Sequence, residues 1–404
     1  MSDGRSTFVA VALATGLSWS ALAPSDAVAR DAYRPIQELT PTATIHLGKT
    51  ADWVAISDHG VWVGSTGPNA VSEIDPRTNR LVATIPLPGD PCAGLAVGHG
   101  GLWVPLCAHP NALVRVDLRT RKVTSVAGIG PADREGGITT SPDSVWLIVD
   151  RKGTLARIDP GSGRVRQRIH VPGGSYNPLY SAGQIWVTRA DGAQVTVVDA
   201  DTGEIAATVR SGPNPRFLTS GDGAVWTLNQ GDGTLTRIDA KRRRVIQTTA
   251  LGTPGRGGDI KFGGGMVWTS FAKVPLTVVD GNSGFVLCQW TGPGGDALGI
   301  AHGAIWLTNY GAGTIGRIEI ADALRHCGRV RNPRPPTVLR SPRRLQREVE
   351  TARSVRDGLD HAGKENGPEE CNQRHICGAT AAVRLRSAQA REAMSEERCC
   401  PGAQ

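Results

Sequence analysis

The sequence predicts an all-β fold, a seven-bladed β-propeller with four antiparallel strands in each blade. Three observations predict it: a tryptophan recurs at a near-constant interval, each interval holds four short β-rich runs, and the strand missing from the last interval is found at the N-terminal end. The recurring tryptophans are spaced by 41, 43, 40, 40, 42 and 38 residues: Trp62, Trp103, Trp146, Trp186, Trp226, Trp268 and Trp306. A period of about forty residues is that of one propeller blade.

Within one unit, four runs rich in β-branched and apolar residues are separated by turn residues. In the fifth unit these runs are 217–220, 224–228, 234–239 and 245–250, with Gly, Asn and Asp between them. Such runs, bounded by turn residues, are typical of short strands joined by hairpins. We expect each repeated tryptophan to fill the core between neighbouring blades, because a blade is covered on both faces.

An acidic residue follows each tryptophan by twelve to fourteen positions, after Val or Ile. These residues are Asp75, Asp117, Asp159, Asp199, Asp239, Asp280 and Glu319. In turns such as "DPRTNR" and "DPGSGR", a carboxylate accepts hydrogen bonds from backbone N–H groups of the turn. We therefore interpret the acidic residues as structural.

Ring closure is predicted from the two ends of the repeat region. After the third strand of the last unit, at 314–320, the residues "ADALRHCG" do not resemble a strand, whereas "ATIHLG" at 43–48 matches the outer-strand pattern "ATIPLPG" at 83–89. An N-terminal strand that completes the last blade would remove an exposed sheet edge. The predicted propeller spans 42–328, preceded by a linker at 30–41.

The N-terminal residues 1–29 have the pattern of a signal peptide. Arg5 precedes an apolar run at 8–23 and the small-x-small site Ala27-Val28-Ala29. The run contains polar residues and is short for a span of about 30 Å. Cleavage after Ala29, giving a secreted or periplasmic protein, is favoured over the alternative of a membrane anchor, and no later segment is predicted to span a membrane.

The formal charge of +8 does not indicate a nucleic-acid partner. The tail at 329–404 holds fifteen Lys and Arg against ten Asp and Glu, and the body has no basic cluster with interleaved aromatic residues. The tail contains no aromatic residue and is predicted to be mostly disordered, apart from a helix with the apolar stripe Leu345, Val349, Ala352, Val355 and Leu359. It is interpreted as a dispensable extension, with contact to acidic envelope polymers or membrane headgroups as the alternative.

The eight cysteines agree with export. A hairpin turn at His99-Gly100 would place Cys92 opposite Cys107, near the Cβ separation that a disulfide requires. Cys288 and Cys327 are predicted to link the sixth blade to the segment after the seventh. The pairing of Cys371, Cys377, Cys399 and Cys400 is left open, and a metal site at Cys371, His375 and Cys377 matches no zinc spacing.

Propeller ligands bind where loops of one face surround the central channel, so the residues that the repeat places there are the candidates. For ligand binding they are Asp90, Tyr176, Asn177, Arg189, Arg216, Asn229, Asp259, Lys273, Asp296 and Tyr310. This polar mixture of both charges and two tyrosines suits a small polar ligand or a peptide. A partner protein is the other class of ligand, and the protein is expected to be a monomer.

The "IWLTNYGAGTIGRI" segment of the last blade resembles the blade repeat of the virginiamycin B (streptogramin B) lyases, and the pattern is similar to YVTN-type seven-bladed propellers of exported bacterial proteins. The resemblance covers the whole propeller. It implies a magnesium-dependent elimination that opens a cyclic lactone antibiotic, with a histidine base and a carboxylate. Under this alternative, His109 and Glu135 are the catalytic candidates, and Mg²⁺ is the only cofactor.

The sequence also departs from the lyase pattern. The lyases tend to carry Glu shortly after the blade tryptophan, whereas three residues after it this chain has Ser65, Leu106, Val149, Arg189, Asn229, Phe271 and Asn309. His59, His99 and His302 fall in turns on the opposite face. A single "VVDGNSGFVLCQW" segment is similar to the tryptophan-docking motif of pyrroloquinoline-quinone dehydrogenases, but one copy in seven blades argues against a quinoprotein. The sequence thus favours an exported binding scaffold without a cofactor, with the lyase as the alternative.

Overall fold

The computed structural model describes residues 33–126, 128–252 and 254–327. The predicted signal peptide at 1–29, the basic tail at 329–404 and its four cysteines lie outside the described residues. Within these residues, no helix is long and apolar enough to cross a bilayer.

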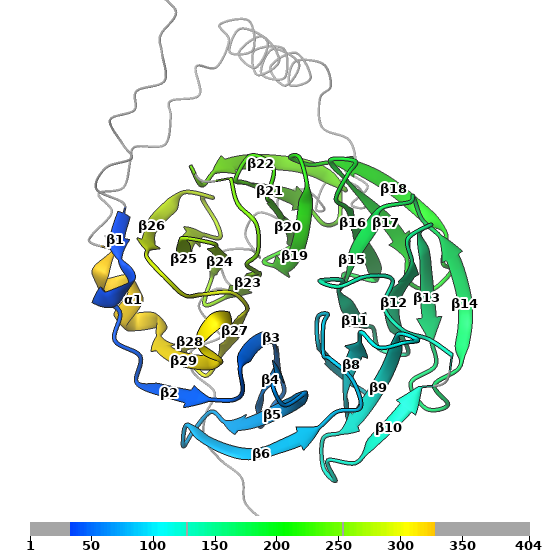
Figure 1. The fold of residues 1–404 in the computed structure, drawn as a ribbon. Helices are drawn as coiled ribbons and strands as arrows, with labels where there is room; N and C mark the ends of the chain where they lie inside the picture. The colour runs from blue at the N-terminus through cyan, green and yellow to red at the C-terminus, as the bar shows by residue number, and fades with distance from the viewer. Residues whose placement is uncertain (1–32, 127, 253, 328–404) are drawn as a thin grey trace, which may run out of the picture. The chain divides into compact units, whose positions relative to one another are not determined.

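The described residues form the seven-bladed β-propeller that the tryptophan repeat predicts (Figure 1). Blades one to four contain the following strands: β3 (Thr50–Ile56), β4 (Val61–Thr66), β5 (Ala70–Asp75) and β6 (Arg80–Pro86); β7 (Ala96–Gly98), β8 (Gly101–Leu106), β9 (Ala112–Asp117) and β10 (Val123–Val126); β11 (Ile138–Thr140), β12 (Val145–Asp150), β13 (Thr154–Ile158) and β14 (Val165–His170); β15 (Ser175–Ser181), β16 (Gln184–Arg189), β17 (Gln194–Asp199) and β18 (Ile205–Arg210).

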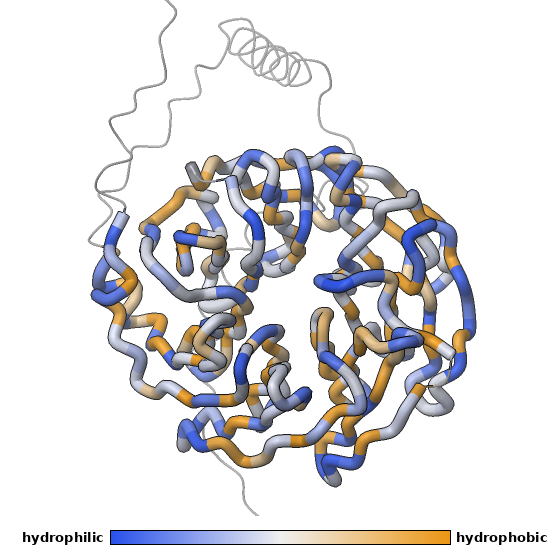
Figure 2. The backbone as a smooth tube through the Cα atoms, in the orientation of Figure 1, coloured by the Kyte–Doolittle hydropathy of each residue, from blue (hydrophilic) through white to orange (hydrophobic). Residues whose placement is uncertain are grey.

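Blades five to seven continue around the ring. Their strands are β19 (Pro215–Gly221), β20 (Ala224–Asn229), β21 (Thr234–Asp239) and β22 (Arg244–Ala250); β23 (Ile260–Gly263), β24 (Met266–Phe271), β25 (Val274–Asp280) and β26 (Val286–Thr291); β27 (Leu298–Ala301), β28 (Ala304–Asn309) and β29 (Thr314–Glu319). Figure 2 shows apolar residues in every blade, interrupted by polar residues at the turns.

Strand β2 (Ala43–His46) closes the ring by pairing antiparallel with β29, from Ala43 opposite Arg317 to His46 opposite Thr314. The prediction of closure by an N-terminal strand is confirmed. The segment "ADALRHCG" forms helix α1 (Ile320–His326) in place of a fourth strand.

The segment expected to be a linker contains a further strand. In it, β1 (Tyr33–Pro35) pairs in parallel with β26, so blade six has five strands, and a 3-10 turn at Ile36–Glu38 leads on to β2. Strand β26 is joined to the other end of the propeller as well, because Cys288 forms a disulfide with Cys327. One outer strand therefore holds both ends of the ring.

The repeated tryptophans form the core between blades. All seven are at most 1% exposed and pack with Val, Ile and Leu of adjacent blades. In three blades an arginine of the third strand lies over the indole ring, as Arg157 does 5.2 Å from the centre of the Trp146 ring. Their predicted structural role is confirmed.

The carboxylates at the ends of the third strands accept backbone hydrogen bonds in six blades. Asp75 accepts from the N–H of Arg77 at 2.8 Å and Asp239 from that of Arg242 at 2.7 Å. Glu319 differs, because helix α1 follows it rather than a hairpin turn, and its carboxylate accepts a hydrogen bond from Arg317 instead.

Candidate functional site

A polar cavity of about 520 Å³ lies at one mouth of the central channel. It is called the mouth cavity below, and its lining residues come from blades three, five, six and seven: Glu135, Asn214, Arg216, Phe217, Gln230, Arg256, Gly257, Asp296 and Tyr310. Four candidates chosen from the sequence therefore converge here: Glu135, Arg216, Asp296 and Tyr310. Blades that are not neighbours can contribute to one cavity only around the channel, which places the cavity on the ring axis.

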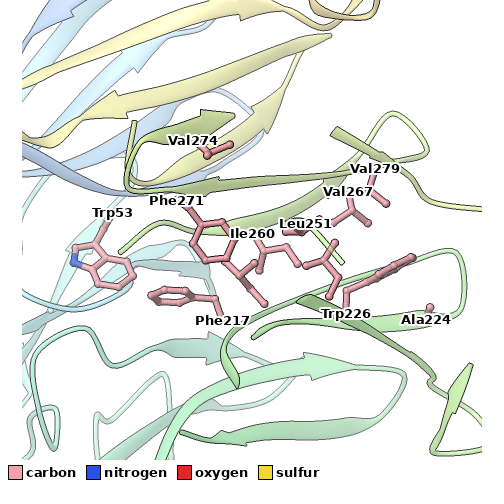
Figure 3. Close-up of a cluster of buried hydrophobic side chains, with 12 residues drawn as sticks. Trp53, Phe217, Ala224, Trp226, Leu251, Ile260, Val267, Phe271, Val274 and Val279 are labelled. Atoms are coloured by element: carbon pink, nitrogen blue, oxygen red, sulfur yellow. The ribbon is translucent and has the colours of Figure 1, made fainter. Parts of the chain in front are cut away.

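The side chains of Trp53 and Phe217 meet across the channel (Figure 3). Trp53 belongs to blade one and Phe217 to blade five, and their rings meet edge to face with centroids 6.1 Å apart. Phe217 lines both the mouth cavity and a second cavity of about 210 Å³ in the channel. The aromatic pair thus separates the mouth cavity from the channel.

Local backbone geometry directs Trp53 into the channel. The β3–β4 pairing shifts register between Asp52 and Val54, and Trp53 between them has a φ of 48°, in the left-handed region that L residues rarely adopt. The Trp53 side chain is only 7% exposed, and no hydrogen-bond partner for its Nε1 is found among the described residues. The bulge therefore directs the side chain of Trp53 into the channel, where it packs against Phe217.

Asp52 and Asp296 form a carboxyl pair beside the cavity. The backbone N–H of Trp53 donates to Asp52 Oδ1 at 2.7 Å, and that of Gly258 donates to Asp296 Oδ1 at 3.1 Å. Gly258 has a φ of 91°, and a Cβ there would lie 1.9 Å from the backbone oxygen of Ser270, so only glycine fits.

Burial raises the pKa of both carboxyl groups. For Asp52 the carboxylates of Asp296 and Glu135 raise it further, and for Asp296 the carboxylate of Asp259 adds to burial. Two adjacent carboxyl groups in a partly buried site oppose each other's ionisation.

Glu135 presents a carboxylate to the cavity from the segment before β11. Its φ is 63°, and its backbone N–H donates to the carbonyl of Cys92 at 2.9 Å. Cys92 is linked to Cys107 as predicted, so this disulfide supports the segment that holds Glu135. Burial, followed by the charge of Asp296, raises the pKa of Glu135, and Arg216 and Arg134 act in the opposite direction. Among the described residues, no side-chain hydrogen bond or ion pair to its carboxylate is found.

Arg216 and Arg256 supply positive charge to the same cavity. The guanidinium of Arg216 lies 3.9 Å from the centre of the Tyr176 ring and donates to the Tyr176 hydroxyl, which itself donates to the carbonyl of Arg134 at 2.5 Å. This stacking fixes the plane of the Arg216 guanidinium. Arg256 has no ion pair among the described residues. The cavity therefore presents both signs of charge.

Tyr310 forms the exposed rim and is 49% exposed. Burial of its hydroxyl raises the pKa of Tyr310, and four carboxylates raise it further: Asp52, Asp90, Glu135 and Asp296. Of these carboxylates, Glu135 and Asp296 line the same cavity as Tyr310.

The other candidates lie elsewhere. Tyr176 lines a neighbouring cavity of about 280 Å³, and Asn177 and Asp259 line the channel cavity, where the Asp259 carboxylate pairs with Lys261 at 2.5 Å. The remaining four are held in local interactions or loops. Asp90 pairs with Arg134, Arg189 with Asp191, Asn229 is fully buried between Thr227, Thr234 and Thr236, and Lys273 lies in the β24–β25 loop.

The histidines follow the predicted arrangement. His109 lies in the β8–β9 loop, whereas His59, His99 and His302 lie in turns between the first and second strands of their blades. His109 lines a cavity of about 790 Å³ that Glu135 does not line. Among the described residues, no group of three or more His, Cys, Asp or Glu is arranged to hold a metal ion.

Sequence reasoning missed several residues of the site: Asp52, Trp53, Phe217, Gln230 and Arg256. A spacing signal identifies the first. Asp52 stands ten residues before Trp62, as Tyr176, Arg216 and Asp296 stand ten residues before their own blade tryptophans. This repeat position marks the channel face, and Trp53 and Phe217 follow it directly, nine residues before Trp62 and Trp226.

Comparison with known proteins supports the fold. No family model matches the chain, and no curated protein matches it. The structure of a streptogramin B lyase matches 69% of this chain and 96% of that chain at 16% identity, with a TM-score of 0.57. BamB from Moraxella catarrhalis matches 70% of this chain and 99% of that chain at 14% identity, with a TM-score of 0.51.

A third structure, the computationally designed Ika8 protein, matches 68% of this chain and 97% of that chain at 12% identity, with a TM-score of 0.54. The structural matches amount to 1651 chains. At these identities the likeness establishes the propeller and leaves the function to be argued from the site.

Proposed function

We propose that this protein is an exported binding protein that takes a small polar ligand into the mouth cavity. The observation that carries the proposal is that Glu135 and Arg256 face one cavity while neither has an ion pair among the described residues. Glu135 is half-buried, whereas Arg256 is exposed at the cavity rim. A half-buried carboxylate costs free energy unless a partner compensates it. A bound ligand supplies such partners.

The size and depth of the site support a small molecule over a protein surface. A cavity of about 520 Å³ lies within the range of roughly 300 to 1,000 Å³ typical of small-molecule sites. The Trp53–Phe217 pair closes the end of the cavity that faces the channel, so a ligand would be held at the mouth. The two disulfides support export, because such bonds persist in oxidising compartments.

A screen of small polar molecules tests the proposal. Purified protein would be heated with amino acids, short peptides, amines, carboxylic acids, sugars and nucleosides, and compounds that raise the melting temperature would be titrated by calorimetry. Glu135→Gln and Arg256→Gln each remove one cavity charge. Arg77→Gln is the control, because Arg77 lies on an exposed outer hairpin.

We expect at least one class to bind, with an affinity lowered about tenfold or more by one of the cavity variants and unchanged by the control. A hydrogen bond to a charged group contributes about 1.5 to 3 kcal/mol, and about 1.4 kcal/mol corresponds to tenfold. The proposal is wrong if no class binds the wild-type protein, or if neither cavity variant changes the affinity.

The lyase remains the second candidate, favoured by the structural likeness to a streptogramin B lyase. It requires a base near the lactone and a group that stabilises the developing charge. His109 and Glu135 stay the candidates for these roles, with Mg²⁺ as the cofactor, and they line different cavities. A ring-opening assay with and without magnesium distinguishes this activity from binding alone.

A further inference from the structure

We infer that the ligand of the mouth cavity is a zwitterion of the amino-acid or short-peptide class, with its ammonium group beside Glu135 and Asp296 and its carboxylate beside Arg216 and Arg256. This inference rests on the proposed function and names the chemical class of the ligand. It follows from the way in which the two signs of charge are arranged around one cavity.

The opposite charges of the cavity do not neutralise one another. Among the described residues, neither Glu135 nor Asp296 has a side-chain nitrogen of Arg216 or Arg256 within the 4.0 Å of an ion pair. Arg216 is held instead by Tyr176, on which it stacks. The cavity thus keeps an acidic part and a basic part available at the same time.

A ligand with a single charge leaves one part of this site uncompensated. A cation would pair with the carboxylates and leave the guanidinium groups of Arg216 and Arg256 without a ligand partner, and an anion would do the reverse. A neutral ligand would leave both parts without a charged partner, and an uncompensated charge in a partly buried site is disfavoured. A ligand that carries both charges satisfies both parts at once.

A second observation points to the same class. Gln230 lines the cavity although it is only 7% exposed. Its Nε2 donates to the carbonyl of Gly257 at 2.9 Å, which fixes the amide, and no partner for its Oε1 is found among the described residues. A fixed acceptor that faces the cavity suits an N–H donor such as a ligand ammonium or amide. Phe217 offers an apolar surface to a ligand side chain.

The test uses the twenty free amino acids and a set of dipeptides, each titrated into the full protein by calorimetry. For the tightest binder, an N-acetylated form removes the positive charge and a C-terminal amide removes the negative charge. We expect each blocked form to bind about tenfold to a hundredfold more weakly than the free form. Equal affinity for the free form and either blocked form overturns the inference.

Two variants test the assignment of each charge to its partner. In Arg256→Gln the preference for the free carboxylate over the amide should fall, while the preference for the free amine is retained. In Glu135→Gln the reverse should hold, and Arg77→Gln should keep both preferences. If neither variant changes the preference for its own charge, the assignment is overturned.

The outcomes separate this inference from the proposed function. If no amino acid or dipeptide binds while a sugar, amine or other class binds in a manner sensitive to the cavity variants, the zwitterion is excluded and the binding function stands. If no class binds at all, both are wrong.

Discussion

At position 53 we expect the glycine variant to be more stable than the alanine variant, the reverse of the usual order in a strand. Trp53 is almost completely buried against Phe217. Its replacement by alanine should cost about 3 to 5 kcal/mol of the free energy of unfolding, because the fixed ring of blades cannot collapse into the space. Alanine would also keep the left-handed backbone, with φ at 48°, that a Cβ disfavours by about 1 to 2 kcal/mol.

Trp53→Gly relieves that backbone strain. Glycine in an ordinary strand is less stable than alanine by about 0.5 to 1 kcal/mol. At position 53 the relief outweighs this cost, so we expect Trp53→Gly to be more stable than Trp53→Ala by roughly 0.5 to 1 kcal/mol.

The measurement is equilibrium unfolding in guanidinium chloride. The neighbouring Val54 provides the matched control, because it is also buried in β3 and does not have a positive φ. There, glycine should be less stable than alanine by the ordinary amount. The same order at both positions would refute the argument that the bulge, rather than burial alone, determines the conformation of Trp53.

Four further predictions follow. N-terminal sequencing of the secreted protein should show cleavage after Ala29, and an intact Met1 on a cytoplasmic protein would contradict this. Deleting residues 30–48 should expose the edge of β29 and cause aggregation in size-exclusion chromatography, whereas a soluble and equally heat-resistant variant would show that β2 is dispensable. The protein should not open a streptogramin B ring with or without magnesium, and activity that disappears in His109→Ala with folding unaffected would overturn the binding function. Asp52→Asn should raise the free energy of unfolding at pH 7, and the gain should shrink as the pH falls toward 4. The pKa of Asp52 is higher in the folded than in the unfolded chain, so ionisation of Asp52 favours the unfolded chain as the pH rises. A pH-independent gain in chemical unfolding would contradict this last prediction.

The scaffold could be predicted from the sequence because its determinants are local and repeated. The same turn residues and the same buried tryptophan recur in every blade, so the pattern of one blade supports the interpretation of the next. The disulfide between Cys92 and Cys107 forms as predicted, although the expected register does not reach it, because Cys107 pairs with Asp90 rather than with Cys92.

The site was less predictable because it depends on contacts between distant blades. The repeat places Arg216 and Asp296 on the channel face, but no local pattern shows that Arg256 faces the same cavity. Trp53 and Phe217 occupy equivalent positions, nine residues before their blade tryptophans, but no local pattern shows that their rings meet across the channel. Strand β1 is three residues long, too short to give a periodic signal.

The pairing of β2 with β29 also determines the order in which the ring can be completed during synthesis. Thr42 and Arg317, which are hydrogen-bonded at this seam, are 275 residues apart, so β2 leaves the ribosome long before its partner exists. Blades one to five need only nearby residues, whereas the seam must wait for nearly the entire propeller. Contacts of such long sequence separation slow folding, and an unpaired strand edge is prone to aggregate while it waits. A chain that is truncated before residue 314 would therefore carry β2 without its partner. Its recognition as misfolded would depend on the absence of the last blade.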